Sequence, residues 1–172
     1  MQRPQPLSIA SLLGPGLLGL LLLAGCSSQP KNKVDPQRML ALHREMALRY
    51  FDQGDLLRAE DQVSKGLDIE PKDEKLKLML GWIRQRRGTR DDIQIAEKIF
   101  RSLLRTKDYR AELGLAEALE RKGILYVEAA EAIERGERES IAADPQQQVA
   151  RLRTEASGCW KEQIECYERV VE

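Results

Sequence analysis

The amino-acid sequence predicts an all-α protein, a solenoid of helical hairpins with about eight antiparallel helices. Beyond Pro36 the chain is rich in helix-forming residues and contains no strict apolar alternation typical of a strand. Glycines recur at Gly54, Gly88, Gly123 and Gly158, spaced 34, 35 and 35 residues apart, which indicates a repeat. Each lies between two amphipathic stretches, where a reversing chain needs a residue that tolerates positive φ.

Residues 1–25 have the features of an export signal. Arg3 is the only charge before the uncharged run 7–23, and the small residues Ala24 and Gly25 precede Cys26. The tetrapeptide ending at Cys26 resembles the lipobox of bacterial lipoproteins. This resemblance implies cleavage before Cys26, acylation of that cysteine and attachment to a membrane through its lipid, since two or more acyl chains anchor a protein stably.

Three other interpretations of this segment stay open: an uncleaved membrane anchor, an ordinary secretory signal in which Cys26 is incidental, and a protein that is not exported. Pro15 and the glycines around it disfavour a long spanning helix. Ser27 follows the cysteine, where aspartate is the retention signal for the inner membrane in the lipoprotein family. The resemblance therefore implies the outer membrane of a bacterial envelope, with the protein facing the periplasm.

The next segment, residues 26–36, is polar and contains two prolines, which predicts a flexible tether. With Arg3 removed, 27 basic residues stand against 28 acidic ones, so the exported chain is nearly neutral. A nucleic-acid-binding protein would show a basic face, and that class of partner is not expected.

Residues 37–172 divide into four predicted hairpins at 37–72, 73–108, 109–144 and 145–172. The boundaries carry Glu70-Pro71, Lys107-Asp108 and Asp144-Pro145, and proline ends one helix and can begin the next. The apolar spacing from residue 125 to residue 140 predicts a long continuous helix in the third hairpin.

The first hairpin resembles the tetratricopeptide repeat, a helix-turn-helix unit, through Ala47, Tyr50, Gly54, Ala59, Val63, Gly66 and Pro71. The fourth resembles it through a helical face formed by Trp160, Ile164, Tyr167 and Val171. Solenoids need shielded ends, and no polar capping helix follows this unit. A homodimer through the uncapped C-terminal unit is therefore one possibility.

The resemblance also implies a concave groove that binds a protein or peptide partner. Carried over residue by residue, its positions are Arg44, Leu48, Phe51, Lys75, Leu78, Trp82, Gln85 and Arg86. The apolar members suit a partner's side chains and the basic members suit its carboxylates. The alternative for Trp82 is that it packs against the helices of the next hairpin.

No catalytic machinery is visible in the sequence. His43 is the only histidine and occupies a packing position, while Gly-x-Ser-x-Gly and phosphate-binding glycine loops are absent. Cys159 and Cys166 are expected to be unpaired, because seven helical residues rise about 10 Å, and a bridge between two copies through Cys159 is the alternative. No metal or other cofactor is expected.

The sequence thus favours a membrane-anchored scaffold or assembly factor that is not an enzyme. A self-associating structural protein is the first alternative. The second is an enzyme that uses carboxylates of the third hairpin, such as Glu128 or Glu131, although these alternate with arginines as on a solvated helix face.

Overall fold

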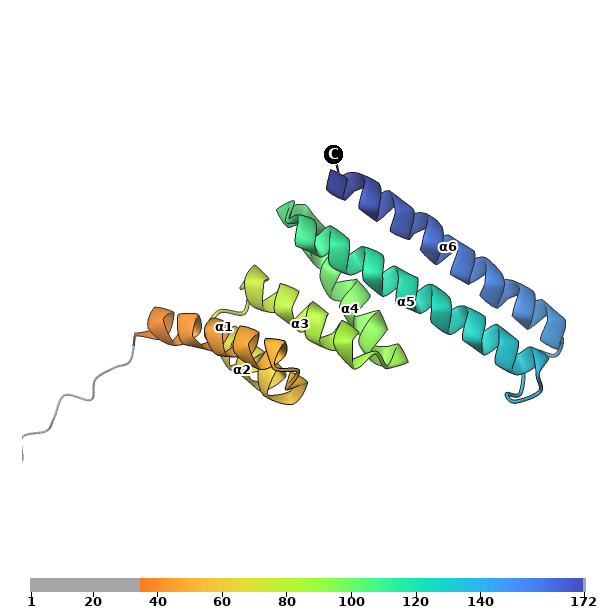
Figure 1. The fold of residues 1–172 in the computed structure, drawn as a ribbon, viewed down its shortest axis with the longest axis horizontal. Coiled ribbons are helices and arrows are strands. Elements are labelled where there is room, and N and C mark those ends of the chain that lie inside the picture. Colours follow the sequence, from red (N-terminus) through yellow and green to blue (C-terminus); the bar gives the residue numbers. More distant parts are fainter. Residues whose placement is uncertain (1–34, 172) are drawn as a thin grey trace, which may run out of the picture. The chain divides into compact units, whose positions relative to one another are not determined.

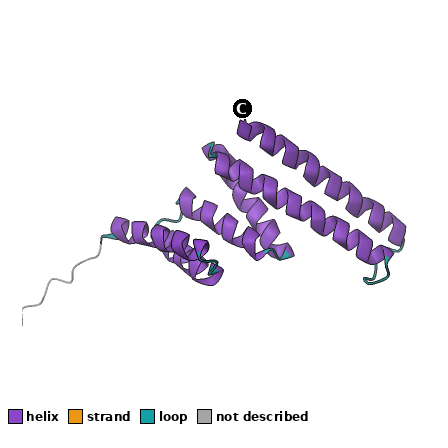
Figure 2. Ribbon diagram, in the orientation of Figure 1, coloured by secondary structure: helices purple, strands orange, loops and turns teal. Residues whose placement is uncertain are grey.

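A computed structural model describes residues 35–171 of the chain. The predicted export signal, Cys26 and most of the predicted tether lie outside the described residues. This part of the chain is helical apart from short loops and contains no strand, so the all-α class is confirmed (Figure 2). None of its helices has both the length and the apolar character needed to cross a membrane.

Six α-helices make up the described part, in three hairpins (Figure 1). The first two hairpins are short, and the third consists of two helices of 26 and 27 residues. In chain order the elements are α1 (Pro36–Asp52), α2 (Leu56–Ile69), α3 (Glu74–Arg87), α4 (Arg90–Leu103), the 3-10 turn η1 (Leu104–Thr106), α5 (Tyr109–Glu134) and α6 (Pro145–Val171).

The prediction of eight helices is not confirmed, because two of the four glycines do not lie at turns between helices. Gly54 and Gly88 follow α1 and α3 with φ of +78° and +71°, as predicted. Gly123 and Gly158 instead lie inside α5 and α6. A Cβ at Gly123 would lie 2.5 Å from Trp160 Nε1, so this glycine permits a close helix contact. Nothing in the structure explains the glycine at position 158.

The third hairpin turns at residues 135–144 instead. The long helix predicted through residue 140 ends at Glu134, and Gly136 adopts a φ of +71°. The side-chain oxygen of Gln148 then accepts three hydrogen bonds, from Ser140 Oγ at 2.6 Å and from the backbone amides of Ile141 and Ala142 at 2.9 and 3.1 Å. These bonds order the loop up to Pro145, where α6 begins at the predicted boundary.

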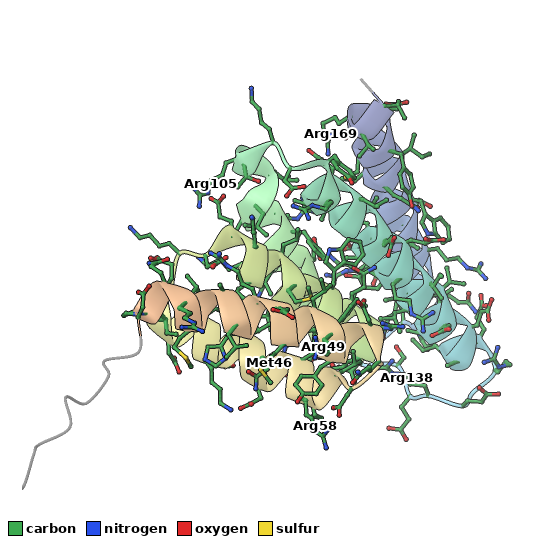
Figure 3. All side chains as sticks on the ribbon, turned by 60° about the vertical axis from the view of Figure 1, so that its left-hand side comes forward. Met46, Arg49, Arg58, Arg105, Arg138 and Arg169 are labelled. Atoms are coloured by element: carbon green, nitrogen blue, oxygen red, sulfur yellow. The ribbon has the colours of Figure 1, made fainter. Side chains whose placement is uncertain are left out.

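The buried side chains form two main clusters. The first joins α1, α2 and α3 through Leu40, Ala47, Ala59, Val63, Leu76 and Ile83. The second joins α3, α4, α5 and α6 around Phe100, whose ring lies against Gly81 and Gly114. Ion pairs tie α6 to its neighbours, since Arg101 of α4 pairs with Glu162, and Arg169 pairs with Glu112 of α5 at 3.1 Å. Arg169 lies near the C-terminal end of α6 (Figure 3).

Both described cysteines are free thiols on the buried side of α6. The two cysteines are unpaired, as expected. Cys166 is fully buried and Cys159 is 7% exposed, so Cys159 is too enclosed to bridge two copies. Burial raises the pKa of the Cys166 thiol to about 11 and also raises that of Cys159. Both thiols are therefore protonated and unreactive at neutral pH.

One solvent-facing side of α6 is polar, and apolar residues are exposed beside it. Ser157, Gly158, Lys161, Glu165 and Glu168 are all exposed there. The homodimer predicted through the C-terminal unit stays a prediction.

Candidate binding groove

The structure brings together the eight residues that the sequence places in a groove. Three lie on α1 and five lie on α3, two helices that contact each other. A first pocket of about 410 Å³ is lined by Arg44, Leu48, Phe51, Lys75, Leu78 and Trp82, among others. A second pocket of about 640 Å³ is lined by Phe51, Trp82, Gln85 and Arg86 from the same set. Phe51 and Trp82 belong to both pockets, so the two form one continuous groove.

The first pocket is mainly apolar. Leu76, Leu78 and Met79 of α3 line it together with the aromatic rings of Phe51 and Trp82. Leu48 stands at its edge with 49% of its surface exposed. An apolar side chain of a partner would find dispersion contacts on several sides here, which a flat surface cannot provide.

Trp82 combines two roles. Its ring packs edge-on against Phe100 of α4, with ring centroids 5.3 Å apart and an interplanar angle of 64°. Phe100 belongs to the second helix of the same hairpin, and Trp82 also packs on the second core cluster, which includes residues of α5 in the next hairpin. The rest of the half-buried Trp82 ring lines both pockets, and the contact with Phe100 fixes its orientation there.

Two basic residues of the first pocket are neutralised within the chain. Arg44 Nε donates to Oδ2 of the buried Asp73 at 2.7 Å, and Arg110 of α5 forms a two-point pair with Asp108. Lys75 is exposed and makes no ion pair with any described residue. Among the lysines and arginines that line this pocket, Lys75 is therefore the one whose charge is available to a partner.

Arg86 shapes the passage between the two pockets. Its guanidinium lies 4.9 Å from the centroid of the Phe51 ring, and its Nη1 donates to the Phe51 carbonyl oxygen at 3.0 Å. The cation therefore holds the end of α1 against α3 and keeps the Phe51 ring in place. Arg86 thus acts on the groove through Phe51 as well as through its own charge.

Gln85 lines the second pocket and has a buried, unsatisfied acceptor. Its Nε2 donates to Glu117 Oε2 of α5 at 2.7 Å, while its Oε1 is buried and accepts no hydrogen bond from the described residues. Burial raises the pKa of the Glu117 carboxyl, the bond from Gln85 opposes this shift, and neighbouring Glu120 adds to it. Gln85 Oε1 is enclosed by the protein, so its lack of a hydrogen bond carries a desolvation cost.

The far wall of the second pocket comes from residues that the sequence analysis missed. Glu117, Glu120, Arg121 and Ile124 of α5 line it together with Tyr167 of α6. The four residues of α5 follow the spacing i, i+3, i+4 and i+7, which places them on one helix face. That signal becomes visible only when α5 is recognised as continuous through Gly123.

The other residues considered for chemistry lie apart from the groove. His43 Nδ1 lies 2.9 Å from Gln62 Oε1, between α1 and α2. Glu128 and Glu131 are exposed on α5, line neither pocket of the groove, and Glu131 pairs with Arg135 at 3.4 Å. The described residues contain no cluster of histidine, cysteine and acidic residues suited to a metal ion. That the chain is not an enzyme stays a prediction.

No family model, curated protein or solved structure matches the chain. The resemblance to tetratricopeptide repeats thus stays an interpretation of the quoted residues.

Proposed function

We propose that this chain is a lipid-anchored adaptor of the bacterial envelope that holds a segment of another protein in the groove. One observation carries the proposal. Residues chosen from the sequence for a groove line two adjoining pockets that share Phe51 and Trp82. Most ligand sites are concave and largely apolar with a few placed polar groups, and this groove has that composition.

The two pockets bind different parts of the partner segment. An apolar side chain of the partner fills the first pocket, with Lys75 beside it to pair with a neighbouring carboxylate. Further along the same segment, polar groups of the partner meet the exposed Glu120 and Arg121, which line the second pocket. Because α1, α3 and α5 hold these groups on rigid helices, binding requires little ordering of the adaptor itself.

The first test compares two exposed leucines. Leu48 stands at the groove with 49% exposure, and Leu57 on α2 is 74% exposed and lines neither pocket of the groove. We expect Leu48→Asp to reduce co-purification of the partner from solubilised envelopes at least about tenfold, because a carboxylate at the pocket edge must be desolvated on binding.

Leu57→Asp is the matched control and should leave co-purification unchanged. Thermal unfolding of both variants checks that each remains folded. Equal co-purification by the wild type, Leu48→Asp and Leu57→Asp would contradict the proposed groove.

The anchor confines the adaptor to a membrane surface and so raises the effective concentration of a bound partner there. We expect Cys26→Ser to release the protein from the membrane fraction and to abolish incorporation of radiolabelled fatty acid, because the acylated thiol is lost. Ser27→Asp is the companion variant. It should keep the label but move the protein from the outer to the inner membrane fraction. Persistent fatty-acid labelling of Cys26→Ser would contradict the lipobox.

A further inference from the structure

An apolar stripe on α6 is partly exposed in the described part of the chain, although the Trp160 ring also lies against Gly123 of α5. Trp160, Ile164, Tyr167 and Val171 are 38%, 58%, 38% and 84% exposed. They are spaced by four, three and four residues, which is the repeat of a coiled-coil seam. The stripe is roughly 16 Å long at 1.5 Å per residue, and it borders the second pocket because Tyr167 lines that pocket.

We propose that a second copy of this chain packs on the stripe, with the two α6 helices antiparallel about a twofold axis. In this arrangement Trp160 faces Val171 of the second copy, and Ile164 faces its Tyr167. Each contact therefore occurs twice, as a twofold interface requires. This inference goes beyond the proposed binding groove and does not depend on it.

The charges beside the stripe select this arrangement. Lys161 and Glu168 each lie one residue after a seam position, on the same flank of the helix, and both are exposed. Neither forms an ion pair with a described residue. Positions of this kind face each other in antiparallel helix pairs, so Lys161 meets Glu168 of the second copy at two places.

A parallel pair lacks this complementarity. There the flank with Lys161 and Glu168 meets the opposite flank of the other helix, which carries the uncharged Gln163 and Val170. A lipid surface is also a poorer occupant, because Glu165 and Glu168 lie beside the stripe and anionic headgroups would repel them. The apolar seam and the charge pattern thus agree on a second antiparallel copy.

Charge reversal tests the proposal. Sedimentation equilibrium of the full chain in density-matched detergent should show a monomer–dimer equilibrium with a Kd of roughly micromolar size, since a single helix pair is a small interface. Lys161→Glu and Glu168→Lys should each raise the Kd about three- to tenfold, because each variant places like charges together at two places. The double variant Lys161→Glu/Glu168→Lys should restore the wild-type Kd.

Ile164→Asp tests the apolar seam separately and should abolish the dimer, while Leu57→Asp should leave it intact. A chain that stays monomeric up to about 300 µM, well above the expected Kd, would overturn the proposal. Single reversals without effect, or a double variant without restoration, would overturn the antiparallel pairing. Leu48→Asp should not alter the Kd, so failure of the dimer and failure of the groove are distinguishable.

Discussion

Replacing Phe100 with alanine is expected to lower the free energy of unfolding by about 3 to 5 kcal/mol. The Phe100 side chain is fully buried in the second core cluster. Its ring lies between two helices that carry glycine at the contact, Gly81 of α3 and Gly114 of α5. Because neither neighbour has a side chain that could fill the space, the alanine variant keeps an open cavity, and cavities of this kind lie at the costly end of the range.

Urea unfolding followed by circular dichroism measures this effect. Leu57→Ala is the control, since Leu57 is 74% exposed and its removal should change stability by less than about 0.5 kcal/mol. Phe100→Ala should also weaken partner binding, because Trp82 loses the ring that orients it. A loss of less than about 1 kcal/mol would mean that the ring is not enclosed as described.

The second large effect is a pair of glycine substitutions with opposite signs. At Gly114 a Cβ would lie 2.5 Å from Phe100 Cζ and 2.7 Å from its Cδ1, and the same ring atoms also lie close to Gly81, so the ring has little room to move. We expect Gly114→Ala to destabilise the protein by about 1 to 3 kcal/mol through overpacking. At Gly158, inside α6, no atom lies within 4 Å of the added Cβ. Gly158→Ala should stabilise the protein by about 0.5 to 1 kcal/mol, because alanine loses less backbone entropy in a helix.

Thermal and urea unfolding of both variants provide the comparison. Gly158→Ala also tests the course of α6, since a turn at this position with positive φ would make alanine destabilising. Destabilisation by both substitutions would therefore contradict the continuous helix.

The sequence predicted the first half of the fold well and the second half poorly, for a physical reason. A glycine serves either a positive φ or a close helix contact, and regular spacing along the chain does not distinguish these uses. Gly54 and Gly88 have the first role, whereas Gly123 has the second because Trp160 approaches it. That contact joins residues far apart in the sequence, so no local pattern reveals it. In the sequence, the only sign of the turn at Gly136 is a glycine within an apolar helical repeat.

The starts of the helices carry a local signal in the sequence. Asp35, Asp55, Asp73 and Asp108 cap α1, α2, α3 and α5, and each carboxylate accepts a backbone amide of the first turn. Aspartate before an amphipathic stretch is readable from sequence. The absence of such a cap before residue 125 favours one long α5 over two short helices.

The groove was predictable as far as it depends on helix faces. The positions on α1 and α3 are those that the resemblance to the tetratricopeptide repeat implies, and both helices form within short hairpins. The state of the charges was not predictable, because Arg44 is neutralised by Asp73 across 29 residues of sequence. Arg44 and Arg110 each form an ion pair within the chain, whereas Lys75 does not, and the sequence alone does not reveal this difference.

Photo-crosslinking in cells tests the central claim, that this groove binds another protein, most directly. A photoreactive amino acid at position 48 places the reactive group at the edge of the first pocket, and the same residue at position 57 is the control on the exposed side of α2. We expect one defined crosslinked product from position 48 that is absent from position 57. The same set of products from both positions, or none from position 48 while the protein is folded and at its membrane, would contradict it.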